Sequence, residues 1–359
     1  MKKIKVVLVF VMVLMLMLGS ISFGSVTVTP IDYTGQSSGN SLIYSDSPER
    51  FGLQNSSLVY LYGRSLGTSY KDVEYYHWLN NNSTQYDKCR IGVAIQNTTS
   101  SSVTITYKGA HTSLDVSATA SNIDTLALGK TPAVLVNYLN ASTKTITIQA
   151  GKSAIVWAND FQFKPGHQKF VFGRGQFKSS KSTGVYLRVF AAGQTKTAAE
   201  VFSVATPVAG ESNHFCGEVN YTQKNLNINV NTDLGKVRLL SEWMENKNIR
   251  EYYGVTSYKS GTNPKLGGNF GVIYNISIAN PAGKKIYIIP KWSDGNKTKA
   301  SAVFKLNNNA WEAATVISNN GADDFMNNCW VRSLGTSTTA TFKFILPGGN
   351  SGNYYVLIK

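Results

Sequence analysis

Four neighbouring residues, Tyr75, Tyr76, His77 and Trp78, are the strongest candidate in this chain for a ligand-binding surface, and asparagines follow them at 80–82. Flat rings stack on sugar faces and side-chain amides reach sugar hydroxyls, so the run is typical of a carbohydrate-binding module. In a strand, successive side chains point to opposite faces, which separates Tyr75 and His77 from Tyr76 and Trp78. Two of the four are therefore expected in a core, and a structural role for the whole run is the alternative.

Tryptophans in the second half of the chain could extend such a surface. Trp292 follows a proline and a lysine, and Trp311 comes shortly after the asparagines at 307–309. A tryptophan near a turn either forms an exposed platform or packs over the end of a sheet, and the sequence leaves both alternatives open. The candidate ligand-binding residues are therefore Tyr75, Tyr76, His77, Trp78, Trp292 and Trp311.

No sequence motif indicates catalysis by carboxyl groups. Hydrolysis of a glycosidic bond needs two carboxyl groups held about 5 to 9.5 Å apart. No motif selects one pairing among the candidate acids Asp160, Glu218, Asp294, Asp323 and Asp324. Adjacent acids in a Gly-Ala-Asp-Asp turn usually form the turn and face water. The acids therefore predict no catalytic residue.

Nucleophilic and metal chemistry lack their motifs as well. No Gly-x-Ser-x-Gly sequence accompanies the histidines, which are His77, His111, His167 and His214. His214 precedes Cys216 by two residues, but no third group in the sequence would orient the imidazole of such a pair. Zinc spacings such as Cys-x-x-Cys are absent. We predict no enzyme, no metal ligands and no cofactor, with calcium binding at an aspartate turn left open.

These candidate residues are expected to lie on β-strands. Before residue 207, β-branched and aromatic residues alternate or cluster between turn signals at 58–62, 90–95, 102–107, 144–148, 153–157 and 184–190. After the turn-prone segment 207–210, comparable segments are 226–230, 236–240, 270–278, 285–289, 302–306, 340–345 and 354–358. We predict an all-β protein of two antiparallel, immunoglobulin-like β-sandwich domains, at 25–207 and 208–359.

Some connections can be predicted too. The segments 92–97 and 103–106, separated by a short polar loop, are typical of an antiparallel hairpin. A glycine turn separates two strands within 146–153. The segment 133–139 is either a short helix or another strand, because periodicity does not decide at that length.

The N-terminus predicts export. Lys2, Lys3 and Lys5 precede an apolar run at 6–18, which leads to small residues at 22–24. A charged start, a short apolar run and a small-x-small site are typical of a signal peptide, here cleaved before Ser25. We therefore expect a signal peptide at 1–24 and an extracellular protein, secreted or associated with the cell surface, with no integral membrane span.

Charge narrows the class of partner. The chain carries a formal net charge of +15, of which +12 remains after residue 24. A basic exported protein attracts anionic surfaces such as cell-wall polymer, although scattered lysines also serve solubility. No helix-turn-helix, zinc-finger or aromatic RNA-binding motif is present, so nucleic acid is not an expected partner. The oligomeric state stays open.

Cysteine usage gives one candidate disulfide pairing. The three cysteines are Cys89, Cys216 and Cys329, and an odd count argues against a disulfide framework. If one bridge forms, Cys216 with Cys329 is the preferred pair, because both lie after residue 207. Ordinary buried thiols are the alternative.

Several short sequence segments, spread over most of the chain, resemble those of a known family. They lie at 44–49, 58–62, 75–80, 267–275 and 352–358. Together they resemble a family of secreted β-rich proteins from spore-forming Gram-positive bacteria. That family is associated with the stalk-like domain named after the N-terminal region of copper amine oxidases. The resemblance implies export and a β-rich fold, and it implies no established activity. The chain has no such stalk domain, histidine cluster or tyrosine-based cofactor motif, so no amine oxidase chemistry is implied.

The sequence thus predicts an exported, non-catalytic binding or structural protein of the cell surface or matrix. Its expected partner is anionic wall polymer or glycan. A secreted hydrolase acting on polysaccharide is one alternative, and it requires a cleft with paired acids. A spore-coat or biofilm component is the other, and it requires self-association, for example through an exposed edge strand.

Overall fold

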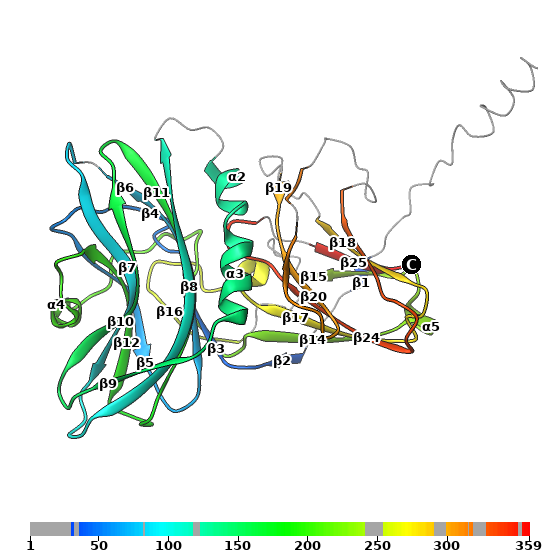
Figure 1. Cartoon of the computed structure of the whole chain (residues 1–359), viewed down its shortest axis with the longest axis horizontal. Coiled ribbons are helices and arrows are strands. Elements are labelled where there is room, and N and C mark those ends of the chain that lie inside the picture. Colours follow the sequence, from blue (N-terminus) through cyan, green and yellow to red (C-terminus); the bar gives the residue numbers. More distant parts are fainter. Residues whose placement is uncertain are drawn as a thin grey trace, which may run out of the picture.

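A computed structural model describes residues 30–31, 36–81, 83–117, 123–240, 254–290, 299–314, 316–318, 328–350 and 354–359. The protein is mostly β, with a few short helices (Figure 1). The expected signal peptide at 1–24 and Trp292 lie outside the described residues. Among the described residues, no helix has the length and apolar character needed to cross a membrane.

The first sheet pair, on the left of Figure 1, consists of an eight-stranded and a four-stranded sheet. The larger sheet has the order β16-β13-β3-β6-β11-β8-β9, and β4 pairs with β6. Its strands are β3 (Ser41–Ser45), β4 (Arg50–Gly52), β6 (Lys71–Asn80), β8 (Val103–Ser117), β9 (Lys144–Ile148), β11 (His167–Ser179), β13 (Cys216–Val219) and β16 (Val255–Tyr258). The smaller sheet has the order β10-β7-β12-β5, formed by β10 (Ser153–Phe163), β7 (Asp87–Asn97), β12 (Val185–Gly193) and β5 (Leu58–Ser65).

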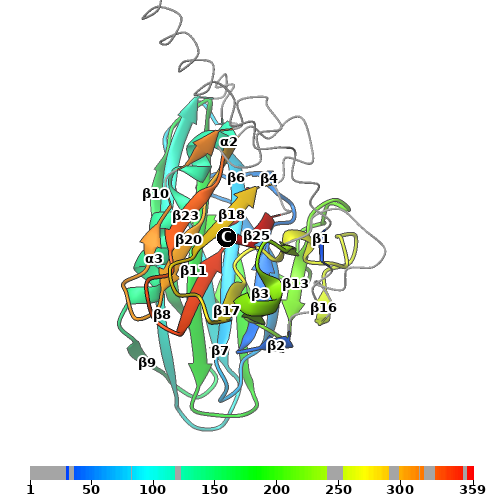
Figure 2. The ribbon, with the colours of Figure 1, turned by 90° about the vertical axis from the view of Figure 1, so that its right-hand side faces the viewer.

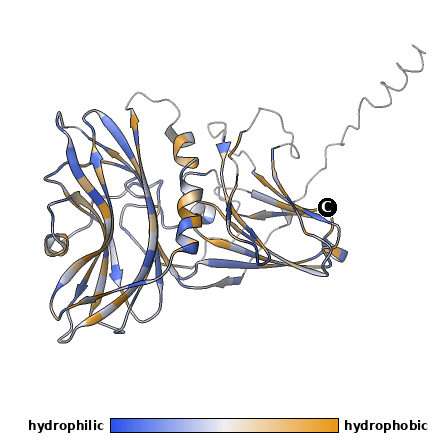
Figure 3. Cartoon of the chain, in the orientation of Figure 1, coloured by the Kyte–Doolittle hydropathy of each residue, from blue (hydrophilic) through white to orange (hydrophobic). Residues whose placement is uncertain are grey.

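One apolar core lies between these two sheets. Val73, Tyr75 and Leu79 of β6 face Ile91 and Val93 of β7 in a single buried cluster. Every second residue of a strand points to the same face, which is why hydrophobic and hydrophilic positions alternate along many of these strands in Figure 3. The other face of β6 contributes Tyr76 and Trp78 to a different cluster.

The second sheet pair lies on the right of Figure 1. A six-stranded sheet of order β2-β14-β17-β24-β20-β21 faces a five-stranded sheet of order β1-β15-β25-β18-β23. The former consists of β2 (Gln36–Ser38), β14 (Gln223–Asn229), β17 (Ile273–Ala279), β24 (Thr339–Ile345), β20 (Val303–Leu306) and β21 (Glu312–Ala313). The latter consists of β1 (Pro30–Ile31), β15 (Val237–Leu240), β25 (Tyr354–Ile358), β18 (Lys285–Pro290) and β23 (Trp330–Ser333), with β25 at its centre (Figure 2).

The core of the second sheet pair is rich in aromatic rings. Phe304 packs on Phe342, Phe344 and Trp330 at centroid distances of 5.3 to 5.7 Å. Phe342 and Phe344 alternate along β24 with partly exposed residues. A separate short ladder joins β19 (Lys299–Ala300) and β22 (Ile317–Ser318).

Short helices cover particular faces. They are α2 (Ile123–Leu128), α3 (Thr131–Asn140), α4 (Ala198–Ser203), α5 (Val230–Asp233) and the 3-10 turn η1 (Gly267–Asn269). The segment 133–139, open between helix and strand in the sequence, is part of α3. Pro132 stands in the first turn of α3, where its missing N–H costs nothing. α3 contacts β8 and β11 on one side and β20 and β21 on the other, so it lies between the sheet pairs (Figure 1).

The predicted strands are present, but two expectations about their pairing are wrong. β7 and β8 do not form a hairpin, because they belong to different sheets. The fully buried amide of Asn97 donates to the carbonyls of Ser101, Ile148 and Gln149, which holds two loops where the chain passes from one sheet to the other. In addition, the sheets are mixed rather than purely antiparallel, since β3 with β6 and β14 with β17 are parallel pairs.

Hydrogen-bonded strands cross the expected domain boundary at residue 207 in both directions. β13 and β16 extend the eight-stranded sheet through β3, whereas β2 pairs with β14 of the second sheet pair. The division at 25–207 and 208–359 stays a prediction. Chain segments on each side of it complete sheets on the other side.

Candidate functional site

The aromatic run that the sequence placed first is buried. Tyr75, His77 and Trp78 are 0% exposed and Tyr76 is 3% exposed. β6 is an interior strand of the eight-stranded sheet, and both of its faces are covered: Tyr75 packs against Trp157, and Trp78 packs against Phe170. The prediction of a sugar-stacking surface at these four residues is therefore wrong, and their structural alternative holds.

Trp311, the other predicted stacking residue within the described part of the chain, is also packed against protein side chains. Trp311 is half-buried against the cluster that contains Tyr76 and Phe172, and the Lys305 ammonium lies 5.9 Å from its ring centroid. Trp330 is buried and stacks on Tyr354 at a centroid distance of 6.3 Å. No row of exposed tryptophans exists among the described residues.

The candidate disulfide between Cys216 and Cys329 is not formed. Cys216 is a free thiol in the core of the first sheet pair, and Cys329 packs against a separate cluster around Ile289 and Tyr355. Burial raises the pKa of Cys216 to about 11 and that of the free Cys89 to about 12, so neither thiol is reactive at neutral pH. The alternative of ordinary buried thiols is the correct one for Cys89 and Cys216.

His214 does not pair with Cys216. Its Nε2 lies 3.2 Å from Glu49 Oε2 and its Nδ1 lies 2.9 Å from Glu211 Oε2. Burial alone would lower the pKa of His214, but the hydrogen bond to Glu49 and the charges of Asp46 and Glu49 outweigh it and raise the pKa to about 9. His214 is thus a cation at neutral pH that ties the 211–214 segment to the segment before β4.

A serine–histidine contact exists in the interior. Ser45 Oγ lies 3.1 Å from His77 Nε2, and His77 Nδ1 lies 2.8 Å from the Pro48 carbonyl. Since a carbonyl only accepts, Nδ1 carries the proton and Nε2 accepts from Ser45. Burial lowers the pKa of His77 to about 3, and both side chains are 0% exposed. No substrate reaches this pair, which satisfies the hydrogen bonds of a closed core.

Two of the acids considered for hydrolysis are described by the structure, and both are held in ion pairs. Asp160 Oδ1 lies 2.9 Å from Arg90 Nε, and Glu218 binds both Arg64 and Lys71. Burial raises the pKa of Glu218, but the hydrogen bonds from Lys71 and Arg64 outweigh it and lower the pKa below its usual value. A general acid needs a raised pKa, so Glu218 is unsuited to that role. Asp294, Asp323 and Asp324 lie outside the described residues.

An open groove of about 400 Å³ lies on the four-stranded sheet beside α4. Cross-strand pairing places Tyr186 between Ser65 and Gln96, and Arg188 between Gly63 and Ala94. The polar and aromatic residues that line the groove are Tyr60, Arg64, Ser65, Gln96, Tyr186, Arg188 and Phe202.

α4 forms one side of this groove because its sequence fixes both of its faces. Thr197 and Glu200 form a capping box, in which each side chain binds the other's backbone N–H. Ala198 and Val201 then pack on Phe190 of β12. The helix therefore begins at a defined residue and ends beside Arg188.

Arg188 is held rigidly. Its Nη1 donates to the carbonyls of Val201 at 2.8 Å and Val204 at 2.7 Å. Its guanidinium carbon lies 4.1 Å from the ring centroid of Tyr60 and 4.9 Å from that of Phe202. Among the described residues Arg188 has no ion-pair partner, so its positive charge is not neutralised within the structure.

The groove has the chemistry of a site for anions and sugars. Tyr186 is 44% exposed and offers a ring face next to the amide of Gln96. Arg188 supplies positive charge, whereas Arg64 is paired with Glu218, and no acidic residue of the described chain lines the groove. A planar guanidinium binds phosphate or carboxylate through paired donors, and an exposed ring stacks on a sugar. Sequence reasoning identified strand 184–190 but not this site, because the pairing partners of Tyr186 and Arg188 are about 90 and 120 residues away.

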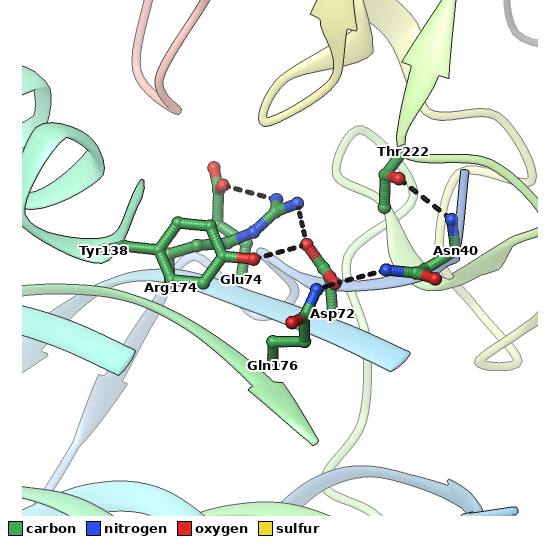
Figure 4. A network of polar contacts seen from close by, with 7 residues as sticks. All are labelled: Asn40, Asp72, Glu74, Tyr138, Arg174, Gln176 and Thr222. Atoms are coloured by element: carbon green, nitrogen blue, oxygen red, sulfur yellow. Dashed lines mark hydrogen bonds and ion pairs between the residues drawn. The ribbon is translucent and has the colours of Figure 1, made fainter. Parts of the chain in front are cut away.

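A second concentration of polar groups is buried on the outer face of the eight-stranded sheet (Figure 4). Arg174 of β11 binds Glu74 through Nη1 at 2.9 Å and Asp72 through Nη2 at 2.7 Å, and the Tyr138 hydroxyl of α3 donates to Asp72 at 2.8 Å. Burial raises the pKa of Glu74 to about 7, although Arg174 acts in the opposite direction. These ion pairs join β6, β11 and α3, and the charged groups are too enclosed to meet a polymer.

No protein-family model matches the chain, and no curated protein matches it. Among solved structures, the chain is similar to a chain of the structure of the Macrobrachium rosenbergii nodavirus. The two are 12% identical over 95% of this chain and 94% of that one, with a TM-score of 0.14. A likeness at that TM-score carries no argument about fold or function.

Proposed function

We propose that this protein is an exported, non-catalytic binding module of the cell surface or matrix, and that the groove beside α4 binds anionic wall polymer or glycan. Its two sheet pairs act as two immunoglobulin-like sandwich domains in this proposal. The resemblance of the segments at 44–49 and 267–275 to secreted β-rich proteins of spore-forming Gram-positive bacteria agrees with such a role.

The groove's lining is the observation that carries the proposal. Arg188 is fixed by two carbonyls and two rings and keeps its charge unneutralised, so it is ready to bind an anion without further ordering. Tyr186 beside it supplies an exposed ring. The formal net charge of +12 that remains after residue 24 gives the long-range attraction that brings an anionic polymer to this face.

The ion pairs made by the acidic residues favour binding over hydrolysis. Asp160 and Glu218 are neutralised by neighbouring cations, and the buried pair Asp72 and Glu74 is held by Arg174. The described acids therefore offer no pair of carboxyl groups placed for glycoside hydrolysis in the groove.

Retention on purified Gram-positive cell walls tests the proposal. Because exposed charges are screened within about 10 Å at 0.1 M salt, retention should fall steeply as salt rises to several hundred millimolar. Walls stripped of their phosphate-containing polymer separate the two ligand classes: loss of retention identifies the polymer, and unchanged retention identifies the glycan. Retention on intact walls that does not change with salt concentration would contradict the electrostatic part of the proposal.

Variants of the groove test where binding occurs. Tyr186→Ala removes an exposed ring without opening a core, and Arg188→Met removes the charge; each should weaken retention at least tenfold at low salt. Tyr86→Ala removes another exposed tyrosine, 57% exposed, and Lys164→Met removes another exposed charge; both should leave retention unchanged. Equal losses in the groove and control variants would show that the groove is not the site.

A further inference from the structure

A second cavity lies between the two sheet pairs, away from the groove. It has a volume of about 180 Å³ and is defined here as the interface pocket, lined among others by Lys108, Tyr138, Leu139, Thr222, Ile273 and Ile345. Lys108 belongs to β8, Tyr138 and Leu139 to α3, and Ile273 and Ile345 to β17 and β24. The pocket therefore exists only where the sheet pairs and α3 meet.

The acidic side of the pocket has no hydrogen-bonding capacity left. Asp72 Oδ2 accepts from Tyr138 at 2.8 Å and from Arg174 at 2.7 Å, and Asp72 Oδ1 accepts from Gln176 at 2.9 Å and from Asn40 at 3.5 Å (Figure 4). Asp72 is 4% exposed and Arg174 is 2% exposed. The carboxylate is thus neutralised and saturated, so it will not bind a cation or a donor group.

Lys108, which also lines the pocket, has ion-pairing capacity to spare. Its Nζ lies 4.7 Å from the ring centroid of Tyr138, and no acid of the described residues lies within ion-pair distance of it. It is half-buried at the rim, as are Gln176 and Leu139. An ammonium removed from much of its water gains most from an anion placed next to it.

Part of the remaining lining is apolar, and the rest includes the neutral polar residues Asn40, Thr222 and Gln223. The apolar part consists of Leu135, Leu139, Ile273 and Ile345. A cavity of about 150 Å³ is large enough for a benzene-sized molecule, so 180 Å³ holds a compact ligand of about six to eight non-hydrogen atoms. A ligand that fits both sides has an anionic end and a short hydrocarbon body.

We propose that the interface pocket binds a small aliphatic carboxylate, whose carboxylate pairs with Lys108 and whose hydrocarbon chain contacts α3 and the strands β17 and β24. Because the ligand touches both sheet pairs, its binding fixes them relative to each other. The inference does not depend on the groove, which lies on the other sheet of the first pair.

Ligand-observed NMR and calorimetry with sodium hexanoate test this proposal on the full mature chain. Hexanoate should bind at one site, and hexylammonium, of similar length and opposite charge, should not. Lys108→Met keeps the length of the side chain and removes its charge, and it should weaken hexanoate binding at least tenfold. Lys144→Met, which removes an exposed charge on β9, should have no effect.

A second variant keeps the test decisive if Lys108→Met folds poorly. Leu139→Trp fills the pocket from its rim while leaving Lys108 in place, and it should abolish hexanoate binding. Tyr186→Ala in the groove should leave hexanoate binding unchanged, which separates this proposal from the wall-binding one. Absence of hexanoate binding, equal binding of hexylammonium, or unchanged binding in both pocket variants would overturn the proposal.

Discussion

Gly271 is the residue at which a single added methyl group should most disturb the contact between the sheet pairs. Its φ is +74°, and a Cβ at this position would lie 2.4 Å from Glu74 Oε2 and 2.6 Å from Arg174 Nη1. Both side chains are fully buried and joined by an ion pair, so neither can move away freely. Gly271→Ala must therefore strain the backbone, compress this ion pair, or displace it.

Gly283 provides a matched control. Its φ is +73°, nearly the same as that of Gly271, and nothing lies within 4 Å of a Cβ built there. A left-handed conformation costs an L-residue about 1 to 2 kcal/mol, and both alanine variants share this cost. Overpacking adds about 1 to 3 kcal/mol at Gly271 alone, and disruption of the buried ion pair adds more. We expect Gly283→Ala to lose about 1 kcal/mol and Gly271→Ala about 3 to 5 kcal/mol of unfolding free energy.

Urea unfolding, followed by intrinsic fluorescence and circular dichroism, measures both losses under the same conditions. The difference between the two variants isolates the steric contact from the backbone strain. A Gly271→Ala variant that is no less stable than Gly283→Ala would refute the close packing of Gly271, just before β17, against Glu74 and Arg174.

Other predictions concern single interior groups. Because the folded-state pKa of His214 is raised from about 6.5 to about 9, its protonation stabilises the fold below pH 6.5, and this contribution of about 3 kcal/mol is lost as pH rises through 9; His214→Gln should have a flatter stability profile in pH titration of the urea midpoint. Under denaturing conditions without reductant, alkylation and mass spectrometry should label Cys89 and Cys216, and an unlabelled Cys216 would restore the disulfide hypothesis. Asn97→Ala removes donors from buried loop carbonyls and should cost about 2 to 4 kcal/mol in thermal or urea unfolding, whereas a loss below 1 kcal/mol would contradict its bridging role.

Local strand formation could be predicted from the sequence because it depends on neighbours. Alternating β-branched and aromatic residues identified segments such as 58–62, 144–148 and 285–289, and each is a strand. Pairing depends on residues far apart, and there the sequence misled: a polar loop after 92–97 is compatible with a hairpin or with a crossing between sheets. Only the buried amide of Asn97 distinguishes the two, and its burial is not visible in the sequence.

The candidate site was misplaced for a related reason. A run of aromatic residues such as Tyr75 to Trp78 has the same composition in a sugar-binding face and in an interior strand covered on both sides. The groove residues Tyr186 and Arg188 alternate with the core residues Leu187 and Val189, so one strand serves both roles. Their partners come from β5, β7 and α4, which only the fold brings together.

Hydrogen–deuterium exchange with and without an oligomer of polyglycerol phosphate tests the central claim most directly, since it locates the bound face without any substitution. Binding in the groove should slow exchange in α4 and at the β5 edge near Tyr60 and Ser65, and it should leave the edge strand β9 unchanged. Protection confined to another face, or none while the oligomer is bound, would contradict the assignment of the groove as the binding site.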